Sequence, residues 1–272
     1  MKGTILENII ERKRERVADL KRSFAVADLR RGASEFRRDR PALRLSRTLS
    51  NHSKINVIAE FKRASPSKGT INDGTRAGDA AAAYAAGGAA AISVLTEEDF
   101  FLGSLDDLKT VRSKVDLPVL RKDFIFDEAQ VFESAIVGAD AFLLIVAALT
   151  LGQLKALQAA AHSLGLDAVV EVHDRPELKV AIDAGAKMIG VNNRDLKTFQ
   201  VSLDVSRELI AHKPKHAIMI AESGITTREE IVELRSLGFD GFLIGETLMR
   251  SGDPGSTLRD LVMSPSAQVV RS

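Results

Sequence analysis

INVIAEFKRASPSKG, at residues 55–69, begins as a short apolar strand and ends as a polar loop. Within the strand, Glu60 and Lys62 lie two residues apart, so their side chains point to the same face. Charged groups at the end of a buried strand are costly unless they are paired or used. The loop Ser65–Gly69 is polar and basic, which suits an anion. A plain ion pair capping the strand is the alternative interpretation, and similar polar endings on later strands count against it.

From residue 55 onward, short apolar runs alternate with helical patterns. The runs, which read as strands covered on both faces, are Ile55–Phe61, Ala90–Thr96, Pro118–Phe124, Ala141–Ala147, Ala168–His173, Met188–Asn193, Ala217–Glu222 and Gly241–Glu246. The helical patterns are Asp79–Ala86, Ser104–Val111, Asp127–Val137, Leu151–Leu164, Pro176–Ala184, Ser202–Leu209, Thr227–Leu237 and Ser256–Leu261. Eight such units predict an α/β fold of the (β/α)8 or TIM-barrel type. The alternative, a doubly wound sheet, predicts a glycine-rich dinucleotide loop after the first strand, and the chain has none there.

The first 50 residues precede the first predicted strand. Apolar residues at helical spacing predict an amphipathic helix over residues 5–21, and we expect residues 22–50 to be irregular. A barrel closes without this segment, so its apolar stripe must be buried elsewhere. We expect a helical extension over the barrel mouth at residues 1–50, a barrel at residues 51–262 and a disordered tail at residues 263–272.

Charge is nearly balanced, with 38 Lys and Arg against 37 Asp and Glu. This balance gives no overall electrostatic case for binding nucleic acid or a membrane. The first 50 residues are basic, however, with 14 Lys or Arg against 7 Asp or Glu. A nucleic-acid arm is one interpretation. A solvated helical face, or a lid whose charge attracts an anionic substrate, is the more common role of such a segment.

The residue inventory excludes several kinds of chemistry. The chain has no cysteine, which rules out disulfides, thiolate catalysis and Cys-ligated zinc. Its five histidines show no metal-ligand spacing. Neither a signal peptide nor a membrane span is visible. We therefore expect a cytoplasmic protein that needs no metal or cofactor and has no nucleic-acid or membrane partner.

Polar residues stand at the carboxyl ends of seven of the eight predicted strands, where barrels of this kind carry their catalytic groups. They are Glu60 and Lys62, Thr96 to Glu98, Arg121 to Asp123, Glu171, Asn192 to Asp195, Glu222 and Ser223, and Gly245 and Glu246. Convergence from seven strands favours a functional site over surface decoration.

Two features of these strand ends suggest a phosphorylated ligand. The pairs Ser223-Gly224 and Gly245-Glu246 follow the seventh and eighth strands, where phosphate sites of such barrels form. Tight turns alone would also explain the glycines. The second feature is a pair of lysines: Lys122 should project toward the same barrel mouth as Lys62. We expect a lowered pKa for a lysine held close to another cation and partly desolvated, which makes it a usable general acid.

The motifs VIAEFKRASPSKG, SVLTEEDFFLGSLDDL, PVLRKDFIFDEAQV, LLIVAAL, VVEVHD, IGVNNRDL, IAESGI and LIGETLM occur in this order, each at its own strand end. The chain resembles the indole-3-glycerol-phosphate synthase family of tryptophan biosynthesis from about Ile5 to Leu261. The amino-terminal ILENIIERKRERV also resembles the helix that this family sets before its barrel. Members convert 1-(2-carboxyphenylamino)-1-deoxyribulose 5-phosphate to indole-3-glycerol phosphate, releasing carbon dioxide and water.

The resemblance implies a role for each catalytic candidate. Lys122 would be the general acid that activates the substrate carbonyl, and Lys62 would neutralise the substrate carboxylate and serve as an acid in dehydration. Glu171 would stabilise the cationic intermediate. Glu60 would handle protons during dehydration, and Asn192 would hold a substrate hydroxyl. None of these steps needs a metal or a cofactor.

The resemblance also implies the substrate-binding residues. Arg194 would support the site, and Phe101 and Phe124 would line the anthranilate pocket. The phosphate would be held by Ser65, Ser223, Gly224, Gly245 and Glu246, the last largely through its backbone. Asn193 stands where the family often has Ser or Ala, which puts only local hydrogen bonding in doubt.

Three alternative functions are weighed against this one. Phosphoribosylanthranilate isomerase has a similar barrel, but that family uses a Cys base that this chain lacks. A non-catalytic barrel that binds a phosphorylated ligand would have lost Lys122 or Glu171, and both are present. RNA binding through residues 1–50 is the third. We expect a small phosphorylated substrate as the partner and a monomer as the oligomeric state.

Overall fold

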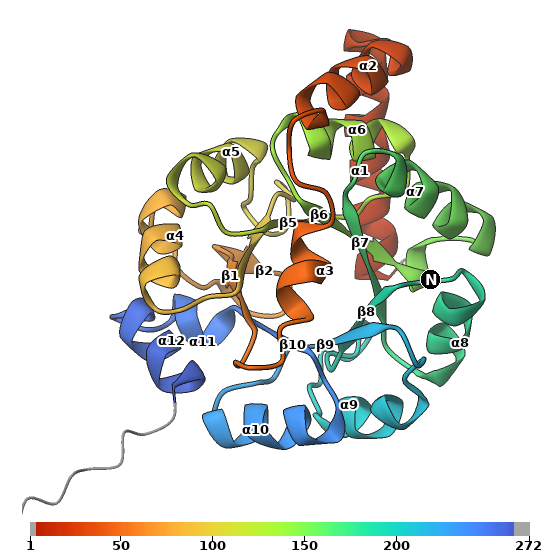
Figure 1. The fold of residues 1–272 in the computed structure, drawn as a ribbon. Helices are drawn as coiled ribbons and strands as arrows, with labels where there is room; N and C mark the ends of the chain where they lie inside the picture. Colours follow the sequence, from red (N-terminus) through yellow and green to blue (C-terminus); the bar gives the residue numbers. More distant parts are fainter. Residues whose placement is uncertain (1–3, 264–272) are drawn as a thin grey trace, which may run out of the picture.

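The computed structural model describes residues 4–263, and a closed ring of parallel strands forms its centre (Figure 1). The strands of the ring are β1 (Val57–Phe61), β4 (Ala91–Leu95), β5 (Val119–Lys122), β6 (Ala141–Ile145), β7 (Asp167–Val172), β8 (Met188–Asn192), β9 (Ile218–Glu222) and β10 (Gly241–Ile244). Strands that are neighbours in this series pair with each other, and β1 closes the ring by pairing with both β4 and β10. The predicted (β/α)8 barrel is confirmed, and the open sheet is excluded.

Helices surround the ring on its outer side (Figure 1). They are α4 (Ala77–Ala86), α5 (Leu105–Lys114), α6 (Glu128–Ile136), η1 (Val146–Ala148), α7 (Leu151–Ser163), α8 (Arg175–Asp183), α9 (Asp204–Leu209), η2 (Ile210–His212), α10 (Arg228–Leu237), α11 (Glu246–Met249) and α12 (Pro254–Val262). Thr227 and Glu230 form a capping box at the start of α10. The helix α11 was not predicted, because four residues are too few for a periodic pattern.

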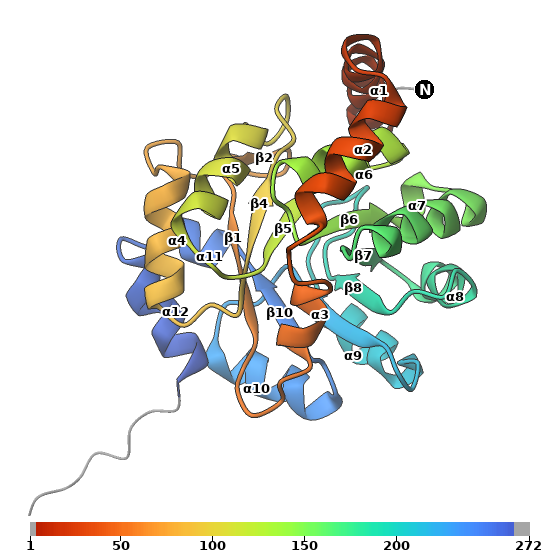
Figure 2. The same ribbon diagram turned by 45° about the horizontal axis from the view of Figure 1, so that its top comes forward.

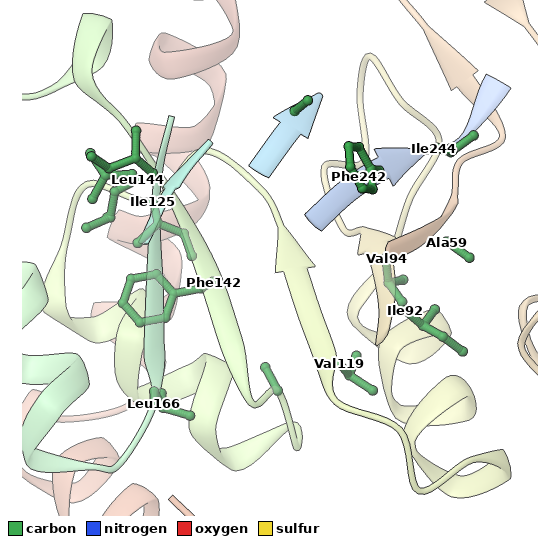
Figure 3. Close-up of a cluster of buried hydrophobic side chains, with 14 of the residues drawn as sticks. Ala59, Ile92, Val94, Val119, Ile125, Phe142, Leu144, Leu166, Phe242 and Ile244 are labelled. Carbon is green, nitrogen blue, oxygen red and sulfur yellow. The ribbon is translucent and has the colours of Figure 1, made fainter. Parts of the chain in front are cut away.

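Alternation along the strands sorts their side chains into two apolar layers. Ile58, Leu120 and Ile220 belong to the layer that fills the inside of the barrel. The other layer lies between strands and helices. Figure 3 shows part of it, with labels on Ala59, Ile92, Val94, Val119, Phe142, Phe242 and Ile244. Because both faces of each strand are buried, the strands read as continuous apolar runs in the sequence.

The segment before the barrel forms three helices, α1 (Ile5–Ser23), α2 (Val26–Arg37) and α3 (Arg44–Leu49). The predicted first helix is confirmed, but the prediction that residues 22–50 are irregular was wrong. Figure 2 shows α1 and α2 together beside α6, against which α2 packs. The buried face of α2 consists of Leu29, Ala33 and Arg37. Because Ala33 is small and Arg37 is charged, this face does not show the run of large apolar residues at helical spacing by which a helix is recognised in a sequence.

The helix α3 closes the amino-terminal end of the barrel and lies across the centre of the ring (Figure 1). Leu45 and Leu49 are fully buried and belong to the apolar layer inside the barrel. The Asn56 side chain donates to the carbonyl oxygen of Leu49 at 3.0 Å, and the backbone N–H of Ser46 donates to Asp167 at the start of β7, also at 3.0 Å. This part of the amino-terminal segment is therefore at the opposite end from the mouth.

Basic residues of the amino-terminal helices pair with acidic residues of the barrel. These ion pairs include Arg16–Asp99, Lys21–Asp127, Arg30–Glu128, Arg37–Asp140 and Arg44–Asp140. Lys13 is buried, and its Nζ atom lies 3.0 Å from Asp123 and 2.8 Å from Glu98. The basic excess of the segment thus serves mainly to hold it on the barrel. Little of it is left to attract an anionic substrate.

The predicted tail at residues 263–272 lies outside the described residues except for Met263, which is exposed. Between residues 4 and 263, no helix is long and apolar enough to cross a membrane. Over the same range, no group of three or more His, Asp or Glu side chains is arranged to hold a metal ion.

Candidate active site

Two cavities lie at the carboxyl ends of the barrel strands, and the predicted site residues line them. Those around the first cavity, of about 130 Å³, are Ser65, Phe101, Lys122, Phe124, Glu171 and Asn192. Those around the second, of about 560 Å³, are Gly224, Gly245 and Glu246. Four of the predicted site residues line both cavities, namely Glu60, Lys62, Arg194 and Ser223. The cavities therefore adjoin, and the structure brings every predicted site residue to one place.

Lys122 ends β5 with its side chain inside the barrel mouth, between two carboxylates. Its Nζ atom donates to Glu171 Oε2 at 2.6 Å and to Glu222 Oε2 at 2.8 Å. Burial alone would lower the pKa of Lys122, but these carboxylates and Glu60 raise it well above its ordinary value. The expectation of a lowered pKa was wrong. Lys62, the cation expected to lower it, is itself paired with Glu60.

Glu171 is buried on β7 and holds a cation on each side. Lys122 contacts its Oε2 atom, and the Nε2 atom of His173 lies 3.4 Å from its Oε1 atom. Burial would raise the pKa of Glu171, but the two cations more than offset this and hold it well below its usual range. The carboxylate is therefore ionised and can face a developing positive charge.

Glu222, at the end of β9, is one of the polar strand ends that the sequence predicts at the mouth, but sequence reasoning gave it no role in the site. It is 1% exposed, and burial together with the Glu171 carboxylate raises its pKa to about 7 despite the Lys122 ammonium. Its Oε1 atom has no hydrogen-bond partner among the described residues. The signal was present in the sequence, because Glu222 follows Ile220 by two positions and so faces the barrel interior.

The predicted pair on β1 is formed. Lys62 Nζ donates to Glu60 Oε1 at 2.6 Å, and Glu60 is 3% exposed. A Cβ atom on Gly245 would come within 2.5 Å of that same oxygen. Gly245 is thus a close-approach position beside the carboxylate as well as part of the second cavity.

An apolar wall forms one side of the first cavity. The rings of Phe101 and Phe124 are tilted by 41° with centroids 6.0 Å apart. Three residues of α1 also line this cavity, Ile5, Leu6 and Ile9. The sequence predicted an apolar stripe here and its place over the mouth, but not these contacts with a ligand pocket.

The second cavity combines left-handed backbone with cations. Ser223 and Gly224 have φ angles of 67° and 81°. The cavity is also lined by Lys68, the basic residue of the loop that the sequence predicts to suit an anion, and by Arg250, which sequence reasoning missed. The Glu246 carboxylate lies 3.7 Å from Lys68 Nζ and 3.1 Å from Arg250 Nε. These ion pairs hold both cations at the same edge of the second cavity. Such a site suits a phosphate dianion.

The loop after β1 is an ordered hairpin in which β2 (Ala64–Ser65) pairs with β3 (Gly69–Thr70). The sequence predicted a polar, basic loop here and did not predict the pairing of its two ends. Arg194 reaches the hairpin and donates to the hydroxyl of Ser67 at 3.3 Å. The hairpin thus contacts the loop that follows β8 across the cavities.

Two asparagines end the β8 strand with different tasks. Asn192 lines the first cavity, and its Oδ1 atom accepts from the backbone N–H of Arg194 at 3.1 Å. Asn193 is buried and donates to the carbonyl oxygens of Glu222 and Ser223 at 3.0 and 3.1 Å. Asn193 therefore ties the end of β8 to the end of β9.

The fold and the site define a class of protein: a (β/α)8-barrel enzyme with buried lysine–carboxylate pairs beside an anion cavity after the seventh and eighth strands. Comparison with known proteins gives the family. A family model described as indole-3-glycerol phosphate synthase matches residues 6–261. The chain belongs to the indole-3-glycerol phosphate synthase family, as its motifs predict.

Individual relatives agree with the family match. The chain is similar to the indole-3-glycerol phosphate synthase of Carboxydothermus hydrogenoformans, with 45% identity over 94% of this chain and 99% of that protein. It is 44% identical to that of Bacteroides thetaiotaomicron, over 95% of this chain and 97% of the relative. Among solved structures, 3-hexulose-6-phosphate synthase from Salmonella typhimurium has a TM-score of 0.59 at 17% identity, over 76% of this chain and 96% of that one. That likeness supports the fold alone.

Proposed function

We propose that this chain closes the indole ring of 1-(2-carboxyphenylamino)-1-deoxyribulose 5-phosphate, with loss of carbon dioxide and water, to give indole-3-glycerol phosphate in tryptophan biosynthesis. The observation that carries the proposal is the position of Lys122. Its ammonium lies between Glu171 and Glu222, in a cavity that has an aromatic wall on one side and adjoins an anion cavity. That combination matches a substrate with an aryl group, a carbonyl and a phosphate.

The first step is carbon–carbon bond formation. The ring carbon that bears the carboxylate attacks the ketone carbon, and Lys122 gives a proton to the ketone oxygen as it becomes an alkoxide. A lysine with a raised pKa stays protonated until this more basic oxygen forms. The positive charge that appears on the aryl ring and nitrogen is stabilised by the ionised Glu171.

The protons can be balanced inside the site. After the first step Lys122 is neutral, and Glu222, whose pKa is about 7, lies 2.8 Å away to restore its proton. The bond between the ring carbon and its carboxylate then breaks, carbon dioxide leaves, and the electron pair of that bond restores the aromatic ring. In dehydration, Lys62 protonates the departing hydroxyl, and Glu60 removes a proton from the adjacent methylene carbon.

Binding groups orient the two ends of the substrate. Lys62 would neutralise the carboxylate before it leaves, Asn192 would hold a hydroxyl, and the aryl group would lie against Phe101 and Phe124. The phosphate would occupy the second cavity among Arg194, Ser223, Gly224, Gly245 and Glu246, with Lys68 and Arg250 supplying further charge. Ser65 would reach it from the adjoining first cavity.

An assay with the carboxyphenylamino-deoxyribulose phosphate tests the proposal. Indole fluorescence should appear together with one carbon dioxide per turnover, and Lys122→Met should bind the substrate without producing indole. Substrate binding by the wild-type chain without indole formation would favour the non-catalytic phosphate-binding barrel instead. The expected monomeric state, the cytoplasmic location and the lack of a nucleic-acid partner stay predictions.

A further inference from the structure

His173 follows β7 directly and lies two residues beyond Glu171, on the same side of the chain. Its outer ring nitrogen is fixed by α8. The Nδ1 atom lies 3.0 Å from Glu177 Oε2, and that oxygen also accepts from the backbone N–H of His173 at 2.8 Å. Glu177 is held in turn, because its backbone N–H donates to the cap residue Asp174 at 2.9 Å. The imidazole ring therefore has a defined orientation.

The inner ring nitrogen of His173 points at the Glu171 carboxylate. Its Nε2 atom lies 3.4 Å from Glu171 Oε1, buried and without an aligned hydrogen bond to any described residue. His173 lines neither cavity. A buried polar atom without a partner needs a reason, and a contact that tightens when substrate arrives is one such reason.

The surroundings of His173 favour its charged form. Burial would lower the pKa of the imidazole, but the Glu171 and Glu177 carboxylates raise it to about 10. The cation Lys122 of β5 contacts the other oxygen of Glu171. The helix η1, packed against β7 and α8, carries no titratable side chain, and Asn192 at the neighbouring end of β8 is uncharged.

We propose that His173 is a positioning residue for the reaction: its imidazolium, clamped by Glu177, fixes Glu171 Oε1 so that Glu171 Oε2 stays on Lys122. The catalytic consequence rests on the proposed function. The row Glu177–His173–Glu171–Lys122 alternates in charge, so each member restrains the next. Loss of the imidazolium would free Glu171 to rotate and to gain a proton at a higher pH.

The first test needs no substrate. In the full chain with isotope-labelled histidine, the ring signals of the five histidines are followed by NMR between pH 5 and 9. The His173 signal, assigned by its loss in His173→Gln, should stay that of an imidazolium throughout. Glu177→Gln should lower its midpoint by about one pH unit or more. A wild-type midpoint near 6.5, or a neutral ring, would overturn the proposal.

The second test is kinetic and separates positioning from packing. His173→Gln should lower kcat about 10- to 100-fold with KM nearly unchanged, and the acidic limb of its kcat profile should move to higher pH. Glu177→Gln should act in the same direction and serves if His173→Gln does not fold. His162→Gln, on the exposed side of α7, is the matched control.

Two outcomes of the kinetic test are decisive. A lower melting temperature with unchanged kcat and an unchanged acidic limb would mean that His173 only packs. The wild-type chain could also produce no indole while its His173 signal behaves as expected. That result would contradict the proposed function but would still support the charged row Glu177–His173–Glu171–Lys122.

Discussion

Gly190 leaves the space that the Glu222 side chain fills, because a Cβ atom on Gly190 would collide with Glu222 Oε1. Gly190 lies inside β8, where a glycine weakens the strand and usually marks a close approach. The approach here is by a carboxylate that holds the catalytic lysine candidate. The position of Lys122 on β5 therefore depends on a missing side chain on β8, three strands away around the ring.

Adding one methyl group at this glycine tests the relationship. Gly190→Ala should displace Glu222 from Lys122 and lower kcat at least tenfold while the fold is kept, because small misplacements of catalytic groups are costly. Turnover and the melting temperature are measured side by side. Gly152→Ala is the control, since a Cβ atom there meets nothing within 4 Å. Equal turnover in both variants would show that Glu222 does not place the lysine.

Removing the lysine should abolish turnover and make stability depend on pH in a new way. Lys122→Met removes the cation that Glu171 and Glu222 share, while His173 still faces Glu171. The pKa of Glu222 therefore rises further above its unfolded value. Glu222 then stabilises the fold only while protonated, so stability should fall as pH rises from about 4.5 toward that raised pKa. The melting temperature of Lys122→Met relative to wild type should therefore be lower at pH 8 than at pH 5.5. A constant difference between the two proteins would contradict this account.

Glu222 should make the wild-type protein less stable above neutral pH. Its folded pKa of about 7 exceeds the ordinary value of 4.5, so its stabilising effect is present below pH 4.5 and lost as pH rises through 7. That difference corresponds to about 3 kcal/mol. Glu222→Gln, which mimics the protonated form, should be the more stable protein at pH 8.5 and lose this advantage at pH 5. Urea unfolding at both pH values measures the effect.

Phosphate binding should depend on the backbone at Gly224. Inorganic phosphate is expected to inhibit competitively, and Gly224→Val should raise both KM and the inhibition constant at least tenfold, because its φ of 81° is unfavourable to valine and its Cβ atom would collide with Val201. Gly185→Val carries a similar strain, at φ 75°, in open space after α8. It should lower the melting temperature without changing either constant. Unchanged phosphate inhibition in Gly224→Val would move the phosphate elsewhere.

Deleting residues 1–45 should prevent folding rather than merely weaken binding. The deletion removes Leu45 from inside the barrel and leaves Asp123 and Asp140 without the cations Lys13 and Arg37. Deleting residues 1–10 removes only the part of α1 that lines the first cavity. That shorter deletion should leave a cooperative unfolding transition and a raised KM. A folded, active protein lacking residues 1–45 would show that α1, α2 and the packing of Leu45 inside the barrel are dispensable.

The sequence predicts the barrel well because its signal is physical and repeated. Strands buried on both faces must be apolar throughout, so the run Ala141–Ala147 is recognisable without any neighbour. The helix α3 escapes such reasoning, because six residues, two of them arginine, carry no period. Its role is clear only from the structure, in which Leu45 and Leu49 fill the amino-terminal end of the barrel.

The candidate site was predictable in its members but not in its electrostatics. Strand ends place Lys62 and Lys122 at one mouth, which suggests two cations acting on each other. The structure instead gives each lysine its own carboxylate partners, with Glu60 on Lys62 and Glu171 on Lys122. Which partner is chosen depends on distances of an ångström or two across the ring, and no sequence spacing contains those.

The closure of the barrel by α3 also bears on the order in which the chain can fold during synthesis. Leu49 leaves the ribosome early, yet it packs near Gly241 in β10, the last strand to emerge. At ribosomal speed the interval between them is roughly 10 to 40 s. For that time the apolar face of α3 lacks one of its final partners, whereas α2 can already pack against α6. A chaperone that binds nascent apolar segments would find its target in residues 44–49, and release would coincide with the pairing of β10 with β1.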